Sequence, residues 1–207
     1  MTRVAVSGAA GRMGRLVCAA VADADDLELS ACYGPAAANE TAAGVSVSAD
    51  PAVVAAAEVV VEFTRPDVVL GNLAWWHRLG VHAVVGTSGF DADRVEQVRE
   101  LWGDGPGRCL IVPNFAVGAV LAMRLAEIAA PFFPVAEVVE MHHDAKADAP
   151  SGTALATAQR IGAVAPEQRR TVDGVPSALG ALGAEVAGVR VHSVRLPGMV
   201  AHQEVLF

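Results

Sequence analysis

Short apolar runs alternate with segments of helical periodicity through the first part of the chain. The run Val4–Ser7 is followed by Met13, Val17 and Val21, which recur at the spacing of one helical face. Four further strand-like runs lie at 27–33, 59–63, 82–86 and 109–115, with helical segments at 67–80 and 91–102. Strands that alternate with helices predict an α/β unit over residues 1–113, a parallel sheet covered by helices on both faces.

The pattern changes after residue 113 and predicts an α+β unit over residues 114–207. Its expected elements are a long apolar helix (117–133), an alternating strand (135–143), a helix (151–161), a loop of small residues (163–186) and two strands around a Pro-Gly turn (189–207). Ser151 is a good helix N-cap, and Gly162 is a residue of the type that ends helices.

The composition indicates a folded protein and narrows its partners. Of the 207 residues 53% are apolar, which argues against disorder, and the net charge of −8 disfavours nucleic acid. The longest uncharged run, Cys109–Met123, is too short for the roughly 20 residues of a membrane span. The N-terminus resembles no signal peptide, so we expect a cytoplasmic protein. The three cysteines, Cys18, Cys32 and Cys109, lack CxxC spacing and predict small buried residues, neither disulfides nor a zinc site.

Gly8, Gly11 and Gly14 form a GxxGxxG pattern directly after the first strand. Such glycines let the backbone approach a pyrophosphate at a helix N-terminus, which predicts a dinucleotide site. The alternative is a tight turn with close helix–strand packing. The loops "GTSGF" (86–90) and "VPNF" (112–115) follow later strands, where ligands of open α/β sheets bind, although ordinary turn chemistry also explains each loop.

The acidic residue that usually binds the ribose of NADH is missing from the end of the second strand. Residues 31–35 read "ACYGP", and Glu28 lies at the wrong end of that strand. Arg12 and Arg15 are candidates to bind the 2′-phosphate of NADPH instead, unless they belong to a solvated helix face. The cofactor is therefore open between NADPH and NADH, with NADPH favoured.

The segment "EMHHDAKADAPSGTA" (140–154) carries the strongest indication of chemistry. Two histidines end a strand, a lysine follows in a proline-containing loop, and a helix start then offers free amides. A helix start and a lysine attract anions, and histidine donates protons near neutral pH. The segment predicts an anionic substrate beside an acid. A histidine pair also fits a structural role or a metal, but no third ligand has metal-site spacing. Arg195 is interpreted as a strand-surface arginine; the alternative is that it reaches a ligand.

Six motifs together resemble the 4-hydroxy-tetrahydrodipicolinate reductase (dihydrodipicolinate reductase) family of diaminopimelate and lysine biosynthesis. They are "GAAGRMG" (8–14), "EFTRPD" (62–67), "GTSGF" (86–90), "PNFAVG" (113–118), "EMHHDAKADAPSGTA" (140–154) and "VRLPGMVAHQEVLF" (194–207). The resemblance covers nearly the whole chain. It implies a Rossmann-like dinucleotide domain over residues 1–113, an α+β substrate-binding and oligomerisation domain over residues 114–207, and assembly into a homotetramer.

The resemblance also implies an activity and the residues that carry it. The family reduces a cyclic hydroxy-imine dicarboxylate with NADH or NADPH, with loss of water, to tetrahydrodipicolinate. His142 is expected to be the general acid and Lys146 its catalytic partner, with no metal. The expected substrate contacts are His143, Ser151, Gly152 and Thr153, and the expected cofactor contacts are Gly8, Gly11, Arg12, Met13, Gly86, Thr87, Ser88, Val112, Pro113, Asn114 and Phe115.

Two departures from the family pattern keep other hypotheses open. Cys32 or Gly34 stands where the family has its acidic ribose residue. The family also continues beyond Phe207, so we expect the C-terminal return to the dinucleotide domain to be missing and activity to be weak if the chain ends there. One alternative is a non-catalytic relative that binds a dinucleotide or a cyclic dicarboxylate without turnover. Another is a reductase of a different cyclic imine.

Overall fold

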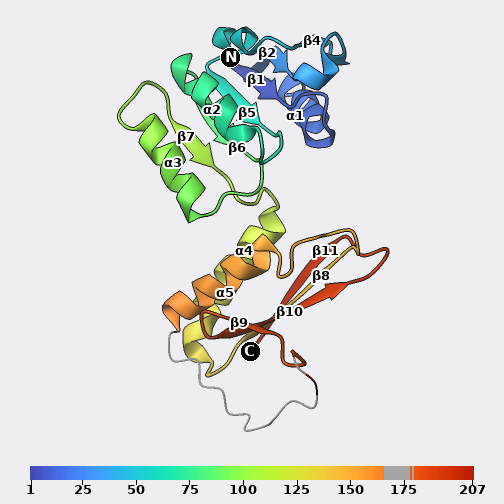
Figure 1. Cartoon of the computed structure of the whole chain (residues 1–207), viewed down its shortest axis with the longest axis vertical. Helices are drawn as coiled ribbons and strands as arrows, with labels where there is room; N and C mark the ends of the chain where they lie inside the picture. Colours follow the sequence, from blue (N-terminus) through green and yellow to red (C-terminus); the bar gives the residue numbers. More distant parts are fainter. Residues whose placement is uncertain (166–177, 179) are drawn as a thin grey trace. The chain divides into compact units, whose positions relative to one another are not determined.

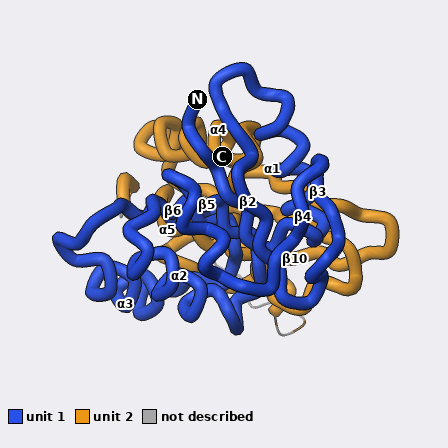
Figure 2. Tube along the Cα trace, turned by 90° about the horizontal axis from the view of Figure 1, so that it is seen from above, with its two compact units in different colours: residues 1–113 blue, residues 114–207 orange. Residues whose placement is uncertain are grey.

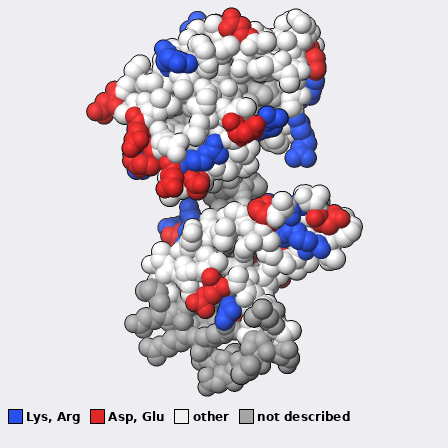
Figure 3. All heavy atoms as spheres, viewed as in Figure 1, with Lys and Arg blue, Asp and Glu red and all other residues white. Residues whose placement is uncertain are grey.

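The chain divides into two compact units, Met1–Pro113 and Asn114–Phe207 (Figures 1 and 2). The structure, a computed structural model, describes residues 1–165, 178 and 180–207. Most of the expected loop at 163–186 therefore lies outside the described residues. At its ends the prediction is wrong, because α5 (Gly152–Val164) runs into it and Ala184–Val186 form strand β9. Acidic and basic side chains are interspersed over the face drawn in Figure 3. Among the described helices, none has both the length and the apolar content that a membrane crossing requires.

The first unit is built on a seven-stranded sheet with the order β3-β4-β2-β1-β5-β6-β7. All neighbouring strands are parallel except β3 and β4, a short antiparallel pair that the sequence pattern did not reveal. The strands are β1 (Thr2–Ser7), β2 (Leu27–Tyr33), β3 (Thr41–Ala42), β4 (Val45–Ser48), β5 (Val59–Glu62), β6 (His82–Val85) and β7 (Cys109–Ile111). The helical elements are α1 (Arg12–Ala22), η1 (Pro35–Ala37), η2 (Pro51–Ala56), α2 (Val69–Arg78) and α3 (Ala92–Trp102).

Both faces of this sheet are buried. Successive side chains of a strand point to opposite sides, so one strand contributes to the core on each face. Ala5 of β1 belongs to a core that contains Trp76 of α2 and Trp102 of α3. Its neighbour Val6 belongs to a second core, with Cys18 of α1. The predicted parallel sheet with helices on both faces is therefore confirmed.

The second unit is an α+β layer pair, as the pattern predicts. Its sheet has the order β11-β8-β10-β9, and one face packs on α4 and α5 to form a core of small and branched side chains. The strands around the Pro-Gly turn, β10 and β11, do not pair with each other but flank β8, parallel and antiparallel respectively. The elements are α4 (Val117–Ala129), η3 (Ala130–Phe132), β8 (Glu137–His142), α5 (Gly152–Val164), β9 (Ala184–Val186), β10 (Val189–Arg195) and β11 (Ala201–Leu206).

The two ends of α5 test the start and stop signals predicted at Ser151 and Gly162. The Ser151 side chain accepts a hydrogen bond from the Ala154 amide at 3.2 Å, so the predicted N-cap is confirmed. The prediction that Gly162 ends this helix is wrong, because α5 continues to Val164. A Cβ at Gly162 would collide with the backbone of Ala187. The glycine there permits close packing and does not terminate the helix.

We predict that Gly162→Ala destabilises the second unit by about 1–3 kcal/mol, because the added methyl group forces α5 away from Ala187. Calorimetric unfolding would measure the loss. Gly118→Ala in α4 is the matched control, since its Cβ meets nothing within 4 Å. The control should be neutral or stabilise by up to about 1 kcal/mol. Equal stability of the two variants would contradict the packing role.

Candidate active site

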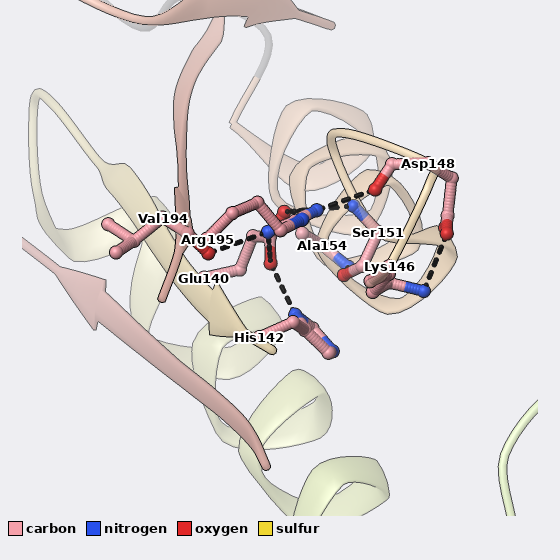
Figure 4. A network of polar contacts seen from close by, with 8 residues as sticks. All are labelled: Glu140, His142, Lys146, Asp148, Ser151, Ala154, Val194 and Arg195. Carbon is pink, nitrogen blue, oxygen red and sulfur yellow. Dashed lines mark hydrogen bonds and ion pairs between the residues drawn. The ribbon is translucent and has the colours of Figure 1, made fainter. Parts of the chain in front are cut away.

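The centre of the candidate active site is the carboxylate of Glu140, which is completely buried. Glu140 and His142 lie two positions apart on β8, so both side chains project from the same face. The carboxylate lies 2.5 Å from Nδ1 of His142 and accepts a hydrogen bond from the Ser151 amide at 3.1 Å. Figure 4 shows the Glu140 side chain between His142 and the start of α5.

Arg195 completes the neutralisation of this buried charge. It is the register partner of His142 on the neighbouring strand β10, and its Nη1 and Nη2 donate to the two Glu140 oxygens at 2.9 and 2.8 Å. Nη2 also donates to the carbonyl of Asp148 at 2.5 Å. The interpretation of Arg195 as a strand-surface arginine is therefore wrong: only 18% of its side chain is exposed.

These contacts decide the ionisation of Glu140. Burial by itself would raise the pKa of the carboxyl group, but hydrogen bonds led by that from Arg195 lower the pKa to about 2. The carboxylate is thus negative at any physiological pH. A fixed negative charge against Nδ1 favours a proton on that nitrogen of His142. No described residue bonds to the other ring nitrogen, Nε2.

Lys146 lies in the loop between β8 and α5, where its ammonium group contacts Asp148 at 2.7 Å. The hydrogen bond from Lys146 lowers the pKa of the Asp148 carboxyl group. The backbone of Lys146 also bonds back to the carbonyl of His143, which closes the turn. The His143 side chain is exposed just beyond the end of β8. The loop thus links the Lys146 ammonium group to Asp148, the residue whose carbonyl Arg195 also contacts.

The start of α5 offers backbone amides. Ser151 is buried, and its amide and hydroxyl are both engaged within the protein. The amides of Gly152 and Thr153 precede the first backbone bond of the helix, from Leu155 to Ser151, so they face outward along the axis. Asn114 donates to the Thr153 hydroxyl at 3.2 Å. This bond places Asn114, a predicted cofactor contact, beside the predicted substrate contacts.

The glycine loop of the first unit has the geometry of a phosphate cradle. Gly8 has a φ of +77°, and a Cβ there or at Gly14 would collide with backbone atoms. Gly11 caps α1 without a side-chain hydrogen bond, and the first turn carries no acidic residue. The amides of Arg12 and Met13 therefore lie at an unblocked helix N-terminus, and both side chains are exposed. These residues fit a dinucleotide pyrophosphate.

A second buried carboxylate, Glu62 at the end of β5, ties together the loops that follow the central strands. It accepts hydrogen bonds from Trp76 at 2.9 Å, from Asn72 at 3.1 Å and from the Thr64 hydroxyl. Its backbone carbonyl accepts from the amide of Gly86, at the next strand's end.

The remaining predicted cofactor contacts follow β6 or β7 in the chain. Thr87 is buried and accepts a hydrogen bond from the Thr64 amide at 2.9 Å, while Ser88 is exposed. The Val112 amide donates to the Val85 carbonyl at 2.9 Å and extends the β6–β7 pairing toward Pro113. Phe115 is 48% exposed. The structure therefore brings Gly86, Thr87 and Val112 to one edge of the sheet, within the first unit.

Sequence reasoning missed both buried carboxylates. Each was visible as an acidic residue inside an apolar strand pattern, at Glu62 in "VVVEF" and at Glu140 in "VAEVVEMHH". A buried acid requires a partner, and this requirement is the signal that was available. Cys18 and Cys32 are buried as expected, and their Sγ atoms lie 3.7 Å apart. Among the described residues no group of three or more His, Cys, Asp or Glu has the arrangement of a metal site.

The Rossmann-like unit followed by an α+β unit defines the class of protein, a dinucleotide-dependent oxidoreductase. Comparison with family models identifies residues 2–115 as "Dihydrodipicolinate reductase, N-terminus" and residues 118–207 as "Dihydrodipicolinate reductase, C-terminus". The chain belongs to the dihydrodipicolinate reductase family. The family resemblance predicted from the motifs is thereby confirmed.

Individual relatives agree with the family models. The chain is 53% identical to the 4-hydroxy-tetrahydrodipicolinate reductase of Nocardia farcinica, over 99% of this chain and 80% of the relative. It is 48% identical to that of Cutibacterium acnes, over 100% of this chain and 81% of the relative. Among solved structures, dipicolinate-bound dihydrodipicolinate reductase from Paenisporosarcina sp. TG-14 matches with a TM-score of 0.83 at 35% identity, over 100% of this chain and 83% of that one.

We predict that Glu140→Gln removes an acid-sensitive part of the stability of the second unit. A carboxylate whose pKa is lowered from 4.5 to about 2 stabilises the fold above pH 4.5 and loses this effect as the pH falls toward 2. Denaturant midpoints measured by circular dichroism across this pH range should fall with pH in the wild type, and this slope should be lost in Glu140→Gln. Glu204→Gln, at an exposed position on β11, is the control and should keep the slope. An unchanged slope in Glu140→Gln would contradict the assignment.

Proposed function

We propose that this chain reduces 4-hydroxy-tetrahydrodipicolinate to tetrahydrodipicolinate with NADH or NADPH, as a step of diaminopimelate and lysine biosynthesis. The observation that carries the proposal is the His142 imidazole held by buried Glu140, beside Lys146 and the open start of α5. Family membership supplies the reaction. A cytoplasmic location and assembly into a homotetramer go with the proposal and remain predictions.

The first unit binds the nicotinamide cofactor, which supplies the hydride when bound. The Gly8–Met13 loop binds the pyrophosphate through backbone amides at the start of α1. Glu62 fixes the loops after β5 and β6, so that Gly86, Thr87 and Ser88 present a constant surface to the cofactor. Val112, Pro113, Asn114 and Phe115 form the remaining contacts of this proposal.

His142 delivers the proton that accompanies the reduction. Its Nδ1 is held at Glu140, so Nε2 is the nitrogen that faces the substrate and donates. The Glu140 carboxylate holds the ring in this orientation, and Arg195 keeps that carboxylate in place. Lys146 acts as the catalytic partner, because its ammonium group adds positive charge where the dianionic ring binds.

The substrate carries two carboxylates, and the start of α5 matches one of them. The outward amides of Gly152 and Thr153 and the helix dipole attract an anion. Ser151 acts through its cap, which orients those amides, and exposed His143 supplies a further donor. Nothing in the described structure favours the alternative of binding without turnover.

We predict that His142→Gln and Lys146→Met each lower turnover by about 10²–10⁴-fold, the usual contribution of a positioned proton donor or charge. Steady-state oxidation of NADPH with freshly prepared substrate measures the effect. Fluorescence titration should show nearly unchanged cofactor affinity, because neither residue is among the proposed cofactor contacts. Unchanged turnover in both variants would refute the assigned roles, and wild-type protein that binds cofactor and dipicolinate without turnover would support the non-catalytic alternative.

Gly152→Ala tests the anion site at the helix start. A Cβ at this position meets nothing within 4 Å, so alanine fits without strain, but its methyl group covers the free amides. We expect binding of dipicolinate to weaken by about tenfold, or about 1.4 kcal/mol, in calorimetric titration. Gly118→Ala at the start of α4 is the control and should bind normally. Normal binding by both variants would place the carboxylate elsewhere.

A further inference from the structure

An ion pair joins the glycine-loop helix to the segment after β2. Arg15 Nη2 contacts the Glu40 carboxylate at 2.5 Å, with exposed fractions of 49% and 52% for the two side chains. The same guanidinium donates to the Ala10 carbonyl at 3.0 Å and to the Thr41 carbonyl at 3.3 Å. Arg15 thus spans from the loop between the first two glycines to Glu40.

The backbone around Glu40 is fixed beside the glycine loop. The amide of Glu40 donates to the Ala37 carbonyl, and its carbonyl accepts from the Val47 amide at 2.8 Å. Two residues further on, Ala42 packs in the same core as Ala9 of the glycine loop. An exposed ion pair on a flexible loop would not fix the position of either side chain. Here both partners are held by backbone contacts, so the pair has a defined place.

The end of the second strand is where a carboxylate normally binds the adenosine ribose. In nucleotide-binding sheets of this type, an acidic residue at the end of the second strand accepts a hydrogen bond from the ribose 2′-hydroxyl. Here β2 ends at Tyr33, whose carbonyl accepts from the amides of Gly8 and Ala9, and Gly34 follows. The strand end offers no side-chain carboxylate. The carboxylate nearest in the chain that contacts the glycine-loop helix is that of Glu40, through Arg15.

We propose that Glu40 is the residue that distinguishes NADH from NADPH, with Arg15 as its positioning partner. The inference rests on the proposed dinucleotide site and deepens it. The Glu40 carboxylate accepts the 2′-hydroxyl of NADH and repels the 2′-phosphate of NADPH. It also occupies Arg15, one of the two arginines that the sequence suggested for a 2′-phosphate. Arg12 remains exposed without a bond to any described residue, so its charge alone faces a 2′-phosphate.

The test measures dissociation constants of NADH and NADPH by fluorescence titration without substrate, so that the readout does not depend on turnover. In Glu40→Gln we expect NADH to bind more weakly and NADPH more tightly, with the ratio of the two constants shifted by at least about tenfold. The matched control is Glu96→Gln, which breaks another exposed Arg–Glu pair, with Arg99 on α3, and changes the net charge equally. An unshifted ratio in Glu40→Gln, or an equal shift in the control, overturns the proposal.

A second variant separates the two members of the pair. If the gain for NADPH comes from a released Arg15 guanidinium, then adding Arg15→Ala to Glu40→Gln should abolish that gain. If the double variant still binds NADPH more tightly than wild type, Arg15 does not bind the 2′-phosphate, and that contact is assigned to Arg12. If wild-type protein binds neither nucleotide, the proposed dinucleotide site fails together with this inference. If wild type binds both and Glu40→Gln leaves their ratio unchanged, only this inference fails.

Discussion

The buried negative charge of Glu140 is the constraint on which the second unit depends. A carboxylate with no solvent exposure is costly unless every oxygen is paired, and this one is paired by Arg195, His142 and the Ser151 amide. Those partners come from β10, from the end of β8 and from the start of α5. Satisfying one charge therefore fixes the three elements that form the site, and it leaves His142 with one nitrogen held and the other available.

The first unit uses the same device at a different place. Glu62 is completely buried at the carboxyl end of β5, where the side chains of Trp76, Asn72 and Thr64 pair its oxygens. Its backbone carbonyl accepts from the Gly86 amide and the Thr87 hydroxyl, so two consecutive loops depend on one residue. In both units a buried acid at a strand end converts flexible loops into a defined surface, which is what a site needs to bind with precision.

The local elements followed from the sequence because they depend on local patterns. Strands β1, β2, β5, β6 and β7 and the helices between them appeared as apolar runs and helical periodicity. The Ser151 cap was equally local, since a serine before a helix pairs with an amide three residues on. The pattern failed at Gly162, where the deciding contact is with Ala187, far along the chain. It also failed at the short strands β3 and β4, which contain too few residues to show a period.

The sequence by itself determined the family, the order of elements and the clustering of His142, His143 and Lys146 in one segment, because motifs and periodicities are written in neighbouring residues. The tertiary structure alone decided that Arg195 pairs with Glu140, 55 positions away, and that Arg15 meets Glu40 across 25 positions. Ion pairs form between groups that the fold brings close together, and for Arg195 the register of β10 against β8 does so. The pairing of β8 with β10 joins segments far apart in the sequence, so no local pattern reveals it.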